Sequence, residues 1–392
     1  MSHRYYGLIT SSILLFVIPA IACIPIDDNK ITDLNNSSSN TDVNHFDASN
    51  GSLNDQIIGD SVSVIKDNSD LKPSNELFNV PEYMKDVWMC TKDSALTFDD
   101  LTTDAEEQHQ CSVNVEYTDE FAILSANGIP NHDFESGLGC CADEVNYQWK
   151  IPLYPKMSSI IEYAPDRGPV AVSVNGVPFF GPEEGPGGDA VAMHFDYFEE
   201  DRQPIVLGLC GGHSGPGDAF HYHYDANCVH WHPENENKSW ADWTIDFLNV
   251  DEPSPVIGFA FDGYPIYGPF GYGQDDEFKQ MLSSYQLKEG KNGYDGIDDW
   301  EYVEGLGDLD ECNGIHSRIP SMNEPVYHYH ASKNSGSGEI GFPYFLLCYS
   351  GIVEETNFAQ GSLIGGPFPQ EGAPPSNNNN GNNNPPPGRR PR

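Results

Sequence analysis

The chain has 392 residues, a formal net charge of −41, 38 glycines and 30 prolines. So strong an acidic balance repels phosphate backbones and anionic lipid headgroups, which excludes nucleic acid and direct lipid contact as partners. The glycine and proline content excludes a helical bundle, because both residues interrupt helices.

Residues 1–22 predict a secretory signal peptide. Arg4 precedes an apolar run at 8–22 that ends in small residues. Pro19 breaks this run, which is too short for a permanent anchor, and no second run follows. Cys23 would also allow lipid attachment in a bacterial cell, which is the less favoured interpretation. We therefore expect a secreted or cell-surface protein with no transmembrane segment in its mature form.

The two ends of the mature chain predict disorder. Residues 23–81 are rich in Asn, Asp and Ser and have too few large apolar residues to close a core. Residues 361–392 form a Pro- and Asn-rich tail of low complexity. The folded domain is therefore expected at 82–360.

Within that range, short runs of β-branched and aromatic residues alternate with turn residues, a pattern typical of a β-sandwich or barrel. The runs lie at 111–117, 146–154, 170–182, 202–210, 254–269 and 344–351. Only 275–290 predicts a helix, because its apolar residues recur at helical spacing: Phe278, Met281, Leu282 and Tyr285. We expect a mainly β domain with one or two short helices.

Two segments of the chain carry the same motifs in the same order. NGVPFFGP at Asn175–Pro182 matches DGYPIYGP at Asp262–Pro269. Each is followed by a Cys-x-Gly turn with a nearby histidine, CGGHS at 210–214 and CNGIHS at 312–317, and then by a His-x-His strand. These matches predict an internal two-fold repeat with copies at about 170–232 and 257–351.

An exported chain usually carries its cysteines as disulfides, so the domain is expected to be disulfide-braced. After Cys23, the cysteines are Cys90, Cys111, Cys140, Cys141, Cys210, Cys228, Cys312 and Cys348. Eight cysteines allow about 105 pairings, so the connectivity cannot be read from the sequence. Cys210–Cys228 and Cys312–Cys348 are the pairs we expect, because each would fix a histidine strand within its own repeat. The neighbours Cys140 and Cys141 are expected to bond two different partners.

The histidines are the best candidates for a functional site, as ligands of a metal ion. His221 and His223 share one face of a strand in the first copy, as do His328 and His330 in the second. If the copies pack about a two-fold axis, the four imidazoles would converge on one transition metal. Weaker candidate ligands are His213, His316, His132, His230 and His232.

Imidazole nitrogen suits zinc, copper, iron or nickel, and copper or zinc is the expected ion. Calcium prefers oxygen ligands, and the acidic segment 295–311 lacks the spacing of a calcium-binding loop. An alternative remains for the histidines. Each Tyr/His strand could be a half-buried strand whose polar tips only make hydrogen bonds, with no ion present.

These motifs resemble the YHYH-domain family of exported proteins over about 117–351. The resemblance rests on NGIPNH, NGVPFFGP, DGYPIYGP, DECNG and YHYHAS with the later FPYFLLCYSG, in that order. It implies no catalytic residues. The first copy reads HYHY where the family signature reads YHYH, so Tyr224 need not play the part of Tyr327.

Three functions are compatible with the sequence. The first is an exported domain that binds a transition metal through its His-x-His strands. The second is a non-catalytic cell-surface or matrix module whose aromatic residues bind a glycan or a protein partner. The third is a metal-dependent hydrolase or oxidase that uses the same histidines. The sequence leaves open whether the chain is an enzyme and what its oligomeric state is.

Overall fold

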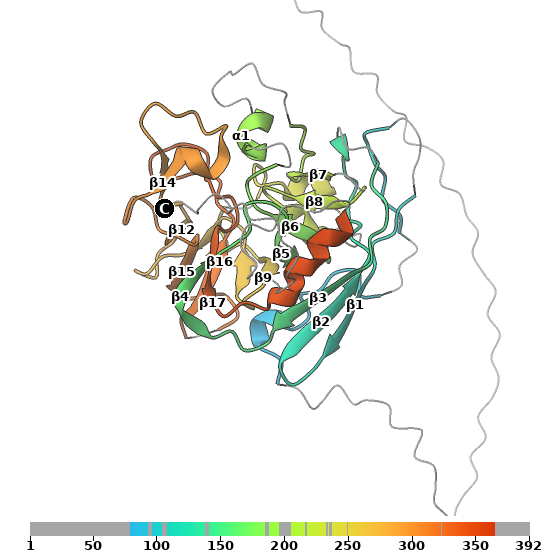
Figure 1. Ribbon diagram of the computed structural model, residues 1–392. Coiled ribbons are helices and arrows are strands. Elements are labelled where there is room, and N and C mark those ends of the chain that lie inside the picture. Colours follow the sequence, from blue (N-terminus) through green and yellow to red (C-terminus); the bar gives the residue numbers. More distant parts are fainter. Residues whose placement is uncertain are drawn as a thin grey trace, which may run out of the picture. The chain divides into compact units, whose positions relative to one another are not determined.

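A computed structural model describes residues 79–364 of the chain, apart from 93–95, 104–107, 138–140, 185–187, 196–204, 216–217, 233, 235–236, 249 and 323 (Figure 1). The expected signal peptide lies outside the described residues, as do nearly all of the expected spacer and tail. The described part is mainly β, as predicted. None of its helices is long and apolar enough to span a bilayer.

The strands are β1 (Val113–Tyr117), β2 (Phe121–Ala126), β3 (Tyr147–Pro152), β4 (Met157–Tyr163), β5 (Pro169–Ser173), β6 (Pro178–Phe180), β7 (Gly212–Ser214), β8 (Phe220–Tyr222), β9 (Val256–Ala260), β10 (Pro265–Tyr267), β11 (Phe270–Tyr272), β12 (Phe278–Gln280), β13 (Tyr285–Leu287), β14 (Trp300–Tyr302), β15 (Gly314–Ser317), β16 (Val326–His330) and β17 (Cys348–Gly351). The helices are α1 (Ala190–Phe195) and the 3-10 helices η1 (Glu82–Met84), η3 (Asn227–His230), η4 (Trp240–Trp243), η5 (Gly296–Asp299) and η6 (Glu355–Ile364).

An eight-stranded sheet forms the centre of the domain, in the order β15-β16-β10-β9-β5-β6-β8-β7. From the antiparallel β5–β9 pair outward, each half has an antiparallel pair, then a parallel pair, then another antiparallel pair. An internal repeat would produce this matching order, although the repeat itself stays a prediction. Within the described residues no sheet closes on itself, so the barrel alternative is wrong.

One tight turn joins β5 to β6, and a second joins β9 to β10. Gly176 and Gly263 lie in them with φ of +84° and +90°, which residues with a side chain rarely adopt. A Cβ on Gly176 would lie 2.4 Å from the Cβ of Ala126, and one on Gly263 would lie 2.4 Å from the backbone oxygen of Pro152. Both turns therefore press against the three-stranded sheet β1-β2-β3 and require glycine.

Trp149 of β3 joins the two sheets in the core. Its side chain is fully buried and stacks on Phe261, with ring centroids 5.6 Å apart. Its indole N–H donates to the Gly176 backbone oxygen at 3.1 Å, so the ring also satisfies a backbone group of the first turn. A large buried aromatic residue that also makes a hydrogen bond fixes how the sheets meet.

The structure contains the disulfides Cys90–Cys111, Cys210–Cys228 and Cys312–Cys348. The last two are the pairs named from the sequence. Cys141 is also disulfide-bonded, while Cys140 lies outside the described residues. The expectation that these neighbours have different partners therefore stays a prediction.

Two element predictions were wrong. The expected helix at 275–290 is instead β12, β13 and turns, because its apolar residues serve different partners. Phe278 pairs with Tyr272 of β11, and Tyr285 pairs with Tyr302 of β14. The expected strand at 202–210 is absent from its described part, where Gly211 N donates to Gly208 O in a turn.

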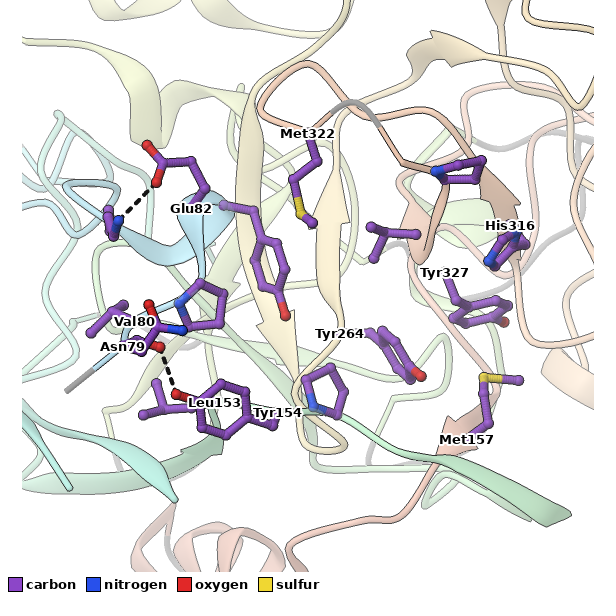
Figure 2. Close-up of a pocket in the computed structure, with 16 residues that line it drawn as sticks. Asn79, Val80, Glu82, Leu153, Tyr154, Met157, Tyr264, His316, Met322 and Tyr327 are labelled. Carbon is purple, nitrogen blue, oxygen red and sulfur yellow. Dashed lines mark hydrogen bonds and ion pairs between the residues drawn. The ribbon is translucent and has the colours of Figure 1, made fainter. Parts of the chain in front are cut away.

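A cavity of about 560 Å³ lies beside η1, β15 and β16 (Figure 2). Its lining includes four tyrosines: Tyr83, Tyr154, Tyr264 and Tyr327. The first and the last two are nearly buried, whereas Tyr154 is 47% exposed. The cavity thus offers aromatic rings to anything that enters it from the surface.

Candidate metal centre

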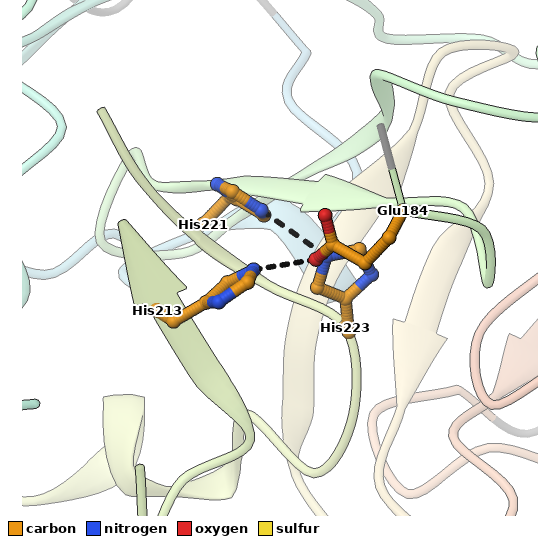
Figure 3. A group of neighbouring side chains, drawn as sticks. All are labelled: Glu184, His213, His221 and His223. Carbon is orange, nitrogen blue, oxygen red and sulfur yellow. Dashed lines mark hydrogen bonds and ion pairs between the residues drawn. The ribbon is translucent and has the colours of Figure 1, made fainter. Parts of the chain in front are cut away.

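Four side chains gather at one end of the central sheet: Glu184, His213, His221 and His223 (Figure 3). Each offers a ligand atom, and these atoms all lie within 4.8 Å of one another. Strand pairing explains the gathering. β7 and β8 are antiparallel and place His213 opposite His221. β6 and β8 are parallel, so their C-terminal ends lie side by side. Glu184 follows β6 and His223 follows β8, and both therefore leave the sheet at the same end of the strands.

Backbone carbonyls fix the orientation of two of these rings. His221 Nδ1 lies 3.1 Å from Ala219 O, and His223 Nδ1 lies 2.8 Å from Gly181 O. A carbonyl oxygen only accepts, so each Nδ1 is the donor and each neutral ring keeps a lone pair on Nε2. The two Nε2 atoms are 3.1 Å apart. Two lone pairs at this distance repel unless a cation lies beside both.

Glu184 supplies the negative charge of the group. Its Oε1 lies 2.7 Å from His213 Nε2 and 3.0 Å from His223 Nε2. Burial alone would raise the pKa of this carboxyl, but His223 and His213 beside it outweigh burial and hold the pKa well below its usual range. That effect requires protons on the two Nε2 atoms, which a bound cation would replace. The carboxylate is therefore ionised at neutral pH and able to bind a cation.

His221 is held in the form that binds metals. Burial, followed by the neighbouring His213 and His223, lowers its pKa well below the ordinary value. The ring of Phe180 stacks on it with centroids 3.9 Å apart and forms an apolar wall. A neutral imidazole whose Nδ1 is held by a carbonyl is the usual state of a histidine ligand.

The group offers three imidazole nitrogens and one carboxylate oxygen. Zinc binds such nitrogens and oxygens at about 2.0 to 2.2 Å. Copper also accepts imidazole, whereas calcium needs six or more oxygens. The donor set therefore could hold zinc or copper and does not fit calcium.

The model of the YHYH protein family matches residues 148–351, just over half of the chain. The chain belongs to this family. A search of curated proteins and a search of solved structures each found no match. All four residues of the candidate metal centre lie within the YHYH domain.

The YHYH domain does not bring its two histidine pairs together. His221 belongs to β8 and His328 to β16, and four strands separate these in the sheet: β6, β5, β9 and β10. The expected convergence of four imidazoles on one ion is therefore wrong. The two halves meet through their innermost strands, β9 and β5. Their histidine strands, β16 and β8, therefore lie near opposite edges of the sheet.

The second pair keeps the ring geometry of the first. His328 Nε2 and His330 Nε2 are 3.1 Å apart. His328 Nδ1 lies 2.8 Å from Val326 O, and His330 Nδ1 lies 2.6 Å from Gly268 O. Burial is the largest cause that lowers their pKa, to about 3 for His328 and about 4 for His330.

The other ligands of the first group have no polar counterpart here. Ile315 lies opposite His328, where the first half has His213 opposite His221. In the first half, Glu184 lies three residues after Gly181, whose carbonyl accepts from His223. In the second half, Gly271 lies three residues after Gly268, whose carbonyl accepts from His330.

Four of the five weaker candidates do not extend either pair. His132 is buried, and its Nε2 accepts from the Tyr222 hydroxyl at 2.9 Å. His230 lies near the Trp243 ring, and burial lowers its pKa to about 4. His232 and His316 are exposed. Of these five candidates, only His213 joins the group.

Glu184 is the candidate ligand that sequence reasoning missed. It lies in a Gly- and Pro-rich segment that resembles a surface loop. The sequence signal for Glu184 is indirect. The residue follows the NGVPFFGP motif, which contains β6, and it reaches a histidine only because β6 pairs in parallel with the His-x-His strand β8. Local sequence does not predict which distant strands pair in this way.

Proposed function

We propose that this chain is an exported YHYH-domain protein that binds one zinc or copper ion through Glu184, His213, His221 and His223. The observation that carries the proposal is the 3.1 Å separation of two buried Nε2 atoms whose Nδ1 atoms are both committed to backbone carbonyls. Export is supported by the disulfides, which persist in oxidising compartments.

Four protein donors favour a binding or structural role for the ion over catalysis. Structural zinc sites are closed by four protein ligands, whereas catalytic ones keep a position for water or substrate. The side chain of His223 is 1% exposed and that of Glu184 is 14% exposed, so the group is shielded from solvent on its histidine side. A hydrolase or oxidase would need a ligand position for water or substrate, gained by loss of Glu184 or by a fifth ligand.

Metal analysis of protein purified without a histidine tag tests this proposal. After incubation with zinc or copper and dialysis, the parent should retain one equivalent per chain. Glu184→Gln keeps the shape of the side chain but removes its charge, and His213→Ala removes one nitrogen, so both should lose most of that ion. His316→Ala is the matched control, because this exposed histidine lies outside the group.

Circular dichroism would show that each variant is folded before its metal content is compared. A parent that retains no ion would contradict the proposal. So would Glu184→Gln and His213→Ala variants that both hold as much metal as the parent.

A second candidate function, binding of a glycan or a protein segment, is favoured by the tyrosine-lined cavity (Figure 2). Tyr154 is its most exposed tyrosine, and its hydroxyl donates to Asn79 O at 2.6 Å. Binding on a glycan or peptide array should persist after chelation and fall in Tyr154→Ala. Binding that disappears with chelation would assign it to the metal centre instead.

A further inference from the structure

A second buried place in the domain has the chemistry of a cation site. The Nε2 atoms of His328 and His330 face each other at 3.1 Å, and each Nδ1 is directed at a backbone carbonyl. Both rings are 1% exposed, so bulk solvent does not reach the two lone pairs. A cation between the rings would remove the repulsion.

Met281, a thioether side chain, packs beside the same place. Its N–H donates to Pro269 O at 2.8 Å, one residue after the Gly268 carbonyl that accepts from His330 Nδ1. A Cβ placed on Gly271 would lie 2.9 Å from His330 Nε2 and 3.6 Å from Met281 Cγ. The methionine and the histidine thus border one position, which the absence of a side chain at residue 271 leaves clear.

The remaining surroundings are apolar. Met281 is fully buried and clusters with Leu309 and Ile315. The ring of Tyr267 lies edge-on to His328, with centroids 5.2 Å apart. Among the described residues, no carboxylate or cysteine completes a ligand group with the two histidines.

The apolar surroundings and the neutral ligands determine which kind of ion would bind here most tightly. The cost of burying an ion rises with the square of its charge, and neutral ligands do not compensate a divalent ion as Glu184 does in the first group. Thioether sulfur favours soft ions such as copper(I) over zinc with its nitrogen and oxygen ligands. A monovalent, soft ion therefore fits this place better than a divalent one.

We propose that His328, His330 and Met281 form a second ion site, separate from the Glu184 group, that binds copper(I) or its analogue silver(I). The site goes beyond the zinc or copper site proposed above and does not depend on it. Each ring donates Nε2 as a neutral ligand, and the methionine donates Sδ.

An anaerobic titration of the full chain with copper(I), against a chromophoric copper(I) chelator, tests the site. The titration uses protein that has first been loaded with zinc. The parent should bind one further equivalent of copper(I), and His328→Ala should lose it. Met281→Leu, which keeps a similar volume in the core, should weaken binding by about tenfold or more. X-ray absorption should show a sulfur neighbour of copper in the parent and none in Met281→Leu.

Glu184→Gln separates this proposal from the first one, because it should abolish zinc retention and leave the sulfur neighbour of copper, which only Met281 would supply, unchanged in X-ray absorption. Three results would overturn the second site: no further copper(I) equivalent in the parent, full binding in both His328→Ala and Met281→Leu, or equal affinity of the site for zinc. Met281→Leu keeps the test decisive if His328→Ala fails to fold.

Discussion

Acidification from pH 7 to pH 5 is expected to destabilise the folded domain through His132. This side chain is 1% exposed. Its Nδ1 donates to Asp133 O at 2.6 Å, and its Nε2 accepts from the Tyr222 hydroxyl at 2.9 Å. Burial lowers its pKa from 6.5 to about 4. The folded protein therefore holds His132 neutral, and a proton on Nε2 would break the bond from Tyr222.

The size of the effect follows from the two pKa values. The unfolded chain takes up a proton near pH 6.5 and the folded chain only near pH 4, so the unfolded state binds more protons between these limits. Stability from the neutral ring is fully present above pH 6.5 and falls as the pH decreases towards 4. At pH 5 the loss amounts to about 2 kcal/mol for this one histidine.

Urea unfolding at pH 7 and pH 5, with a metal chelator present and the disulfides intact, measures the loss. His132→Gln should lose about 2 kcal/mol less than the parent between the two pH values, whatever its stability at pH 7. His232→Gln, in which a half-exposed histidine is replaced, should behave like the parent. If His132→Gln and the parent show the same pH dependence, the reasoning from burial is refuted.

Three further predictions concern the metal centre and the contact between the sheets. Zinc at about 100 times its dissociation constant should stabilise the parent by about 2.7 kcal/mol, seen as a rise in Tm by calorimetry, and Glu184→Gln should show no rise. Gly263→Ala should lower the free energy of unfolding by several times more than Gly305→Ala in urea titrations. Both glycines have a positive φ, but only a Cβ on Gly263 meets an atom, Pro152 O at 2.4 Å. Trp149→Ala should cost about 3–5 kcal/mol in the same titration, and a cost under about 1 kcal/mol would contradict its place in the core.

The local features of the fold were accessible from the sequence. Alternating β-branched and aromatic runs predicted β1, β3, β17 and the four inner strands β5, β6, β9 and β10 of the central sheet, and the NGVPFFGP and DGYPIYGP motifs marked its two tight turns. The helix at 275–290 failed for a physical reason. Apolar spacing shows which residues are buried, but Phe278 and Tyr285 are buried against strands from elsewhere in the chain.

The candidate site was accessible only in part. The two-residue period of a strand correctly places His221 beside His223, and His328 beside His330, because that period is a local property. The rest depends on long-range pairing. The β5–β9 contact decides that the pairs lie apart, and the β6–β8 contact decides that Glu184 reaches the first pair. No spacing along the chain encodes either contact.

The two histidine pairs together show which features orient the rings and which would choose the ion. In both halves the second histidine donates to the carbonyl of a Gly-Pro step, at Gly181 and at Gly268. The residues that differ, Glu184 against Gly271 and His213 against Ile315, are those whose side chains would touch the ion. Ring orientation therefore belongs to the shared strand arrangement, while charge and donor number are set at two neighbouring positions. The same backbone can thus offer a divalent ion four ligands in one half, and leave only two imidazoles and a thioether for a softer ion in the other.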